Sequence, residues 1–199
     1  PDMKPVQTLA EMAKEQGKKV AIVSSVSIDH ATPAAFYAHV EKRSMYHAID
    51  MALANSDIDF FAGGGLKDPM GTRKGVESQG NAIEIAEANG FTFVTGRDDI
   101  LALEPVDGQK FVAINEWLQD SGALPYQIDT RDNADVNIAE FTAKAIEMVD
   151  NDDEGFFIMV EGGKIDWACH ANDAKAAIID NVAFDESVAK AVEFMKKHP

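Results

Sequence analysis

The chain has 199 residues, a length that suits one domain or part of a larger one. Hydrophobic residues make up 46% of it and charged residues 26%, which is ordinary globular composition and excludes an intrinsically disordered chain. With 18 basic residues against 34 acidic ones, the formal net charge is −16. This charge excludes a general nucleic-acid binder, because a phosphate backbone needs a basic face.

The apolar pattern predicts alternating helices and strands. In chain order it gives a helix with its apolar stripe at 6–13, a strand at 20–23, a short helix from 32, a helix at 45–53, a strand at 58–61, a helix at 81–89, strands at 91–94 and 110–114, a helix at 141–149, a strand at 156–160 and a helix at 171–197. This order predicts an α/β fold: a mostly parallel sheet flanked by helices in three layers. No linker marks a boundary, so we expect residues 1–199 to belong to one domain.

Local signals set some of the element ends. Thr32 followed by Pro33 predicts a helix start, with Thr32 as the N-cap and the proline in the first turn. Asn181 is a place where the last helix could break. The acidic stretch 150–154 is expected to be a solvated loop rather than a cation site.

The chain ends and the cysteine content suggest what kind of protein this is. No apolar run approaches the ~20 residues of a membrane span, so no membrane contact is expected. Cys169 stands alone, which excludes a disulfide within the chain. The first residue is Pro1 and not Met, so we expect a piece cut from a longer protein, with a correspondingly incomplete sheet.

Three stretches lie at the carboxyl ends of predicted strands, where α/β folds place their chemistry. They are residues 28–33, the glycine turn 63–65 and residues 161–170. The triple glycine could cradle a phosphate, but no Lys-Ser or Lys-Thr follows it, which favours a structural turn.

Asp166 and His170 are four residues apart and would project from one face of a helix. A carboxylate and an imidazole so placed can share one zinc ion. Spacing alone fits equally a surface aspartate with a histidine that caps the helix, so both interpretations remain open at this point.

Two blocks of the sequence resemble the alkaline phosphatase family. The family's signature Val-Glu-Gly-x-x-Ile-Asp-x-x-x-His is similar to the stretch Val160-Glu161-Gly162-Gly163-Lys164-Ile165-Asp166 followed by His170. A second block, in which Ala-Thr-Pro-Ala precedes an arginine, is similar to Ala31-Thr32-Pro33-Ala34 with Arg43. The resemblance implies the three-layer α/β/α fold of that family, of which this chain would be the central portion.

The resemblance also implies roles for single residues. Glu161 and Thr32 match ligands of a magnesium site, which suits a hard cation. Asp166 and His170 match two of the three protein ligands of a zinc ion. Arg43 matches the arginine that holds the substrate phosphate, where a planar fork suits two phosphate oxygens.

Two positions depart from the best-known bacterial member of the family. His30 stands where that enzyme has an aspartate, and Trp167 stands where it has a lysine. A histidine at position 30 is expected to shape the surroundings of a metal rather than to bind a hard ion directly.

The implied reaction is hydrolysis of phosphomonoesters through a phosphoserine intermediate, with zinc and magnesium as cofactors. In the family the serine nucleophile lies upstream of the first block. Ser24, Ser25 and Ser27 lack its context, so we expect the 199 residues to be inactive alone. The alternatives are a non-catalytic α/β module, or a phosphodiesterase or phosphomutase that shares this metal core.

The resemblance extends to partners and compartment. Small phosphomonoesters are the implied ligands, and the periplasm or the outside of the cell is the implied location. We also expect a homo-oligomer, a dimer, because strand edges and apolar helix faces exposed by truncation recruit other chains.

Overall fold

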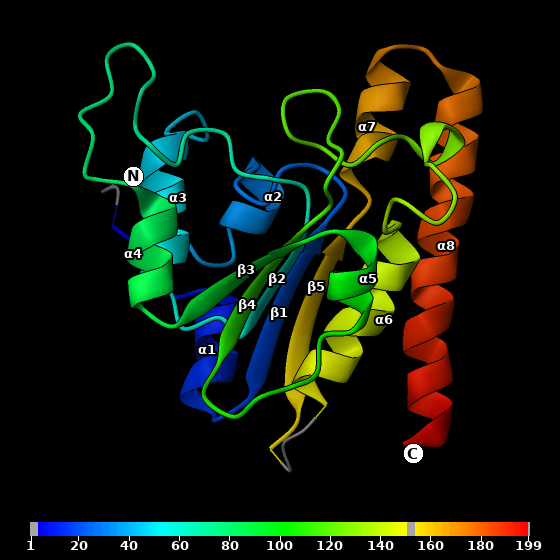
Figure 1. Cartoon of the computed structure of the whole chain (residues 1–199), viewed down its shortest axis with the longest axis horizontal. Coiled ribbons are helices and arrows are strands. Elements are labelled where there is room, and N and C mark those ends of the chain that lie inside the picture. The colour runs from blue at the N-terminus through cyan, green and yellow to red at the C-terminus, as the bar shows by residue number, and fades with distance from the viewer. Residues whose placement is uncertain (1–3, 151–153, 199) are drawn as a thin grey trace.

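The computed structural model describes residues 4–150 and 154–198; residues 151–153 of the predicted acidic loop lie outside them. A five-stranded parallel sheet forms the centre, with the strand order β3-β4-β2-β1-β5 (Figure 1). The strands are β1 (Lys19–Ser24), β2 (Phe60–Gly63), β3 (Phe91–Thr95), β4 (Lys110–Ile114) and β5 (Phe156–Glu161). The helices are α1 (Leu9–Glu15), α2 (Ala31–Ala34), α3 (Tyr46–Ala54), α4 (Ala82–Ala88), α5 (Arg97–Leu101), η1 (Gln127–Asp129, a 3₁₀ turn), α6 (Ile138–Val149), α7 (Gly163–His170) and α8 (Ala174–Lys197).

The sheet is buried on both faces by two separate sets of apolar side chains. Val20 and Ile22 of β1 point into a cluster that contains residues of α1, α3 and α4. Ala21 and Val23, which alternate with them, point into a second cluster that contains residues of α6 and α8. The three-layer α/β class predicted from the sequence is therefore confirmed (Figure 1).

The predicted start of the short helix was wrong, because the N-cap lies two residues before the expected Thr32. Helix α2 begins at Ala31, and the N-cap is His30, whose side chain makes no capping hydrogen bond. The chain enters the helix early because His30 N–H and Ala34 N–H already bond to the carbonyls of Ser27 and His30. Pro33 still lies in the first turn, where its missing N–H costs nothing.

The last helical stretch also differs from the prediction. Helix α8 starts at Ala174, where the Asp173 side chain accepts a hydrogen bond from Ala176 N–H, and it runs to Lys197 without a break. Asn181 is exposed on this helix, where asparagine is only slightly unfavourable, so nothing ends the helix there.

The carboxyl ends of β1, β2 and β5 lie side by side, and the three stretches singled out above, residues 28–33, 63–65 and 161–170, lie at or shortly after these ends. Ser24, the last residue of β1, is paired in register with Gly63 of β2 on one side and with Glu161 of β5 on the other. A Cβ at Gly63 would lie 1.9 Å from the Ser24 carbonyl oxygen, and its φ is +124°. Glycine is therefore required where the backbone leaves β2.

Candidate active site

Glu161 ends β5 and faces the last residue of β1. Its Oε2 accepts a 2.6 Å hydrogen bond from Ser24 Oγ. Thr32 is exposed on α2, and no hydrogen bond joins it to Glu161 within residues 4–150 and 154–198. The sequence analysis did not find the contact between Ser24 and Glu161, because no local pattern pairs residues on separate strands.

The two predicted zinc ligands meet on α7. Asp166 Oδ1 and His170 Nε2 are 3.5 Å apart, and their side chains are 70% and 78% exposed. Two ligand atoms bound to one tetrahedral zinc are about 3.3–3.5 Å apart, so this pair fits a shared ion. In the part of the chain that the structure describes, no group of three or more His, Cys, Asp or Glu side chains converges on a point.

Next to this pair, His30 packs against Trp167 and contacts Arg43. The two ring centroids are 5.7 Å apart at 72°, and Arg43 Nη2 lies 3.1 Å from His30 Nε2. Burial, together with the nearby charges of Lys67 and Arg43, lowers the pKa of His30 to about 4, although Asp166 acts in the opposite direction. The imidazole is therefore neutral, and it accepts at Nε2 because arginine can only donate.

Lys67 is a site residue that the sequence analysis missed. Its Nζ lies 6.0 Å from the Trp167 ring centroid and 4.7 Å from that of Tyr46. Its backbone N–H donates a 2.6 Å hydrogen bond to Asp29 Oδ2. The one available signal was its position directly after the glycine turn at the end of a predicted strand.

Helix α7 is held in place by a buried cation. Lys164 is fully buried; its Nζ lies 2.6 Å from Asp120 Oδ2 and 3.5 Å from the Tyr126 ring centroid. The same Nζ lies 5.4 Å from the Trp167 ring centroid. Because Lys164 precedes Asp166 by two residues, this contact fixes the helix turn that presents Asp166 and His170.

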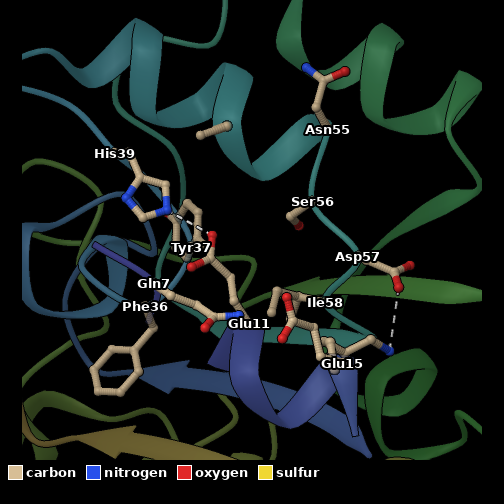
Figure 2. Close-up of a pocket in the computed structure, with 12 residues that line it drawn as sticks. Gln7, Glu11, Glu15, Phe36, Tyr37, His39, Asn55, Ser56, Asp57 and Ile58 are labelled. Carbon is tan, nitrogen blue, oxygen red and sulfur yellow. Dashed lines mark hydrogen bonds and ion pairs between the residues drawn. The ribbon is translucent and has the colours of Figure 1, made fainter. Parts of the chain in front are cut away.

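A separate cavity lies elsewhere in the molecule. It has a volume of about 930 Å³, and Figure 2 shows Glu15 of α1, Asp57 and Ile58 among its lining residues. Asp57 and Ile58 come just before β2, so the cavity opens at the amino ends of the strands. On its wall the His39 side chain points to Glu11, with Nε2 2.7 Å from Oε1. This cavity takes no part in the candidate site.

The described helices include none that is both long enough and apolar enough to span a lipid bilayer.

Comparisons with known proteins agree with the geometry. The family model described as Alkaline phosphatase matches residues 1–199. Alkaline phosphatase 4 of Bacillus subtilis (strain 168) is 33% identical over 200 residues, which are 98% of this chain and 40% of that protein. The structure of alkaline phosphatase from the Antarctic bacterium TAB5 has a TM-score of 0.83 at 34% identity, over 99% of this chain and 54% of that one.

A variant of the TAB5 enzyme, solved with Mg bound in its M3 site, has a TM-score of 0.82 at 33% identity over the same shares of the two chains. The chain thus spans about 40% of the length of the Bacillus relative and about half that of the TAB5 enzyme. The family model that matches from the first residue to the last shows that this chain belongs to the alkaline phosphatase family.

Proposed function

We propose that the whole protein that carries this chain hydrolyses phosphomonoesters in a metal-dependent reaction through a phosphoserine intermediate. The observation that carries this proposal is the position of Arg43, an exposed guanidinium that contacts the neutral His30 next to the paired Asp166 and His170. A planar guanidinium beside potential zinc ligands suits a phosphate group, whose oxygen atoms could bind the guanidinium and a zinc ion at the same time.

The donor chemistry of these side chains fits the two cofactors. Asp166 and His170 would hold zinc, and the oxygen atoms of Glu161 and Thr32 are the ligands that magnesium prefers. When bound, these ions supply Lewis acidity toward the phosphoryl oxygens and lower the pKa of water. A magnesium-bound structure of a TAB5 variant supports magnesium as one of the cofactors.

The chain's own residues bind and orient the substrate. Arg43 donates to two phosphate oxygens, and His30 fixes the guanidinium by accepting at Nε2. The Trp167 ring, packed on His30, excludes water from that side of the phosphate. None of the serines in the chain lies in the family's nucleophile context, so we propose that the 199 residues alone do not turn over. Membership of the family also suggests the periplasm or the outside of the cell as the compartment.

The proposal is tested with p-nitrophenyl phosphate at alkaline pH in the presence of zinc and magnesium. We expect the whole protein to turn over at ~1–1000 per second and the 199-residue chain not to turn over. Arg43→Ala in the whole protein should raise KM, and Asp166→Ala should remove most of the activity together with bound zinc. Lys42→Ala, at the exposed neighbour of Arg43, is the matched control. A whole protein without phosphatase activity would overturn the proposal.

A further inference from the structure

Arg43 and Lys67 each lie beside one ring of the packed pair His30 and Trp167. Arg43 Nη2 lies 3.1 Å from His30 Nε2, and the His30 ring centroid lies 5.7 Å from that of Trp167. Lys67 Nζ lies 6.0 Å from the same Trp167 centroid and 3.5 Å from Tyr46 Oη. The two cations therefore come from separate segments and flank the packed rings of His30 and Trp167.

These two cations and the nearby Arg73 form no ion pair with a carboxylate in the described part of the chain. Arg73 lies over the Tyr46 ring at 4.6 Å and donates to the Lys67 carbonyl at 3.3 Å. In a chain with 34 acidic and 18 basic residues, three unpaired cations at one place indicate a site for an anion.

The backbone that carries Lys67 is tied down by two buried carboxyl groups. Lys67 N–H donates to Asp29 Oδ2 at 2.6 Å, and Asp68 N–H donates to Asp50 Oδ2 at 3.1 Å. The side chains of Asp29 and Asp50 are fully buried, and no hydrogen-bond donor reaches their Oδ1 atoms within the described chain. Burial and the charge of Asp29 raise the pKa of Asp50 to about 9, so a carboxyl proton on Asp50 is the remaining donor for these atoms. The two buried acids therefore position the backbone of Lys67.

We propose that Lys67 is a specificity-determining residue that binds a second anionic group, carried by the alcohol portion of the substrate. This inference rests on the proposed function. Arg43, with its planar fork, suits the phosphate that is hydrolysed, and Lys67 offers a point charge beside Tyr46 and Trp167. The substrates favoured by this arrangement are phosphomonoesters whose alcohol portion carries a further phosphate, such as sugar bisphosphates.

The test compares kcat/KM for fructose 1,6-bisphosphate and for p-nitrophenyl phosphate, whose alcohol portion carries no phosphate, in the whole protein. Lys67→Gln should lower kcat/KM for the bisphosphate by about tenfold, the effect of one lost charged hydrogen bond, and change that for p-nitrophenyl phosphate less than about twofold. Lys67→Arg should restore most of the preference for the bisphosphate. Lys74→Gln, at an exposed lysine seven residues along the chain, should change neither value.

An equal loss of kcat/KM with both substrates would place Lys67 on the hydrolysed phosphate and overturn the inference. No loss with either substrate would overturn it as well. Either result would leave the proposed function standing, because p-nitrophenyl phosphate is still hydrolysed by the unaltered protein. Hydrolysis of neither substrate by the unaltered protein would instead refute the proposed function, and the inference with it. Circular dichroism of Lys67→Gln separates a loss of binding from a loss of fold.

Discussion

Ser24 and Glu161 are paired in the register between β1 and β5, and the serine hydroxyl also donates a hydrogen bond of 2.6 Å to the glutamate carboxylate. This hydrogen bond joins the two strand ends that carry the candidate site. Ser24 Oγ in addition accepts from Val26 N–H at 3.2 Å, so one side chain ties the end of β1 to β5 and to the turn that follows β1.

Removal of this hydroxyl should destabilise the chain. Ser24→Ala leaves the Glu161 carboxylate without its donor, and we expect the free energy of unfolding to fall by about 1–2 kcal/mol. Urea unfolding followed by circular dichroism measures the change. Ser44→Ala, at an exposed serine outside the site, is the control and should leave the midpoint unchanged. An equal midpoint for Ser24→Ala would show that the contact contributes nothing to stability.

The buried pair Asp29 and Asp50 should make stability fall with rising pH. Burial and the charge of Asp29 raise the pKa of Asp50 to about 9 from a value of 3.8 in the unfolded chain. Between these values the folded chain holds a proton that the unfolded chain has lost, so stability decreases as pH rises from about 4 to about 9. Above pH 9 this contribution no longer changes.

Asp50→Asn should remove that part of the pH dependence. The amide keeps an oxygen to accept from Asp68 N–H and an NH₂ group to donate to Asp29, so it mimics the protonated acid. Urea midpoints at pH 5, 7 and 9 should then fall less steeply than in the unaltered chain. Asp107→Asn, at an exposed aspartate, controls for the lost charge. Parallel slopes for all three proteins would contradict a shared proton.

The glycine that ends β2 should tolerate no side chain. In Gly63→Ala the new Cβ would meet the Ser24 carbonyl oxygen at 1.9 Å, and the φ of +124° is strained for any other residue. We expect this variant to be recovered unfolded or insoluble. Gly75→Ala is matched, because Gly75 has a φ of +85° but nothing within 4 Å of a Cβ, and it should cost only about 1 kcal/mol. Soluble yield and the urea midpoint measure the difference.

The 199-residue chain should self-associate. Among the described strands β5 is an edge strand, and α8 beside it exposes apolar side chains: Ile178 at 64%, Val182 at 58% and Met195 at 61%. The net charge of −16 acts over only ~8 Å at physiological salt and does not prevent pairing of such surfaces. Light scattering after size exclusion should give a dimer mass that Val182→Glu reduces to the monomer. Val106→Glu, exposed at 51% away from α8, should remain dimeric; a monomeric unaltered chain would refute the prediction.

The elements that rest on local pattern could be predicted from the sequence. Runs such as Phe156–Val160 are apolar and β-branched or aromatic whatever surrounds them, and they are strands in the structure. The distance between Asp166 and His170 likewise depends only on the helix turn between them. Local propensity was not sufficient at Thr32, because the hydrogen bonds of the preceding turn, to Ser27 and His30, set the start of the helix.

The rest of the site depends on residues that approach one another only in the folded chain. Asp29 comes from the loop between β1 and α2 and Asp50 from the middle of α3, and each is an ordinary acidic residue in its own sequence context. Nothing near Lys67 shows that two buried carboxyl groups hold its backbone. Such long-range pairs could not be predicted without the arrangement of the strands.

The position of β5 beside β1 also has a kinetic consequence. Ser24 and Glu161 are 137 residues apart in sequence, yet they close the same edge of the sheet. During synthesis β1 can pair with β2 soon after it emerges, whereas its other side stays open until β5 has been made. Pairing over so long a separation is slow, because the entropy of closing the loop is lost before any contact forms. The site at Glu161, Asp166 and His170 is therefore assembled only after this long-range pairing, and a metal ion that binds there would select chains that have completed it.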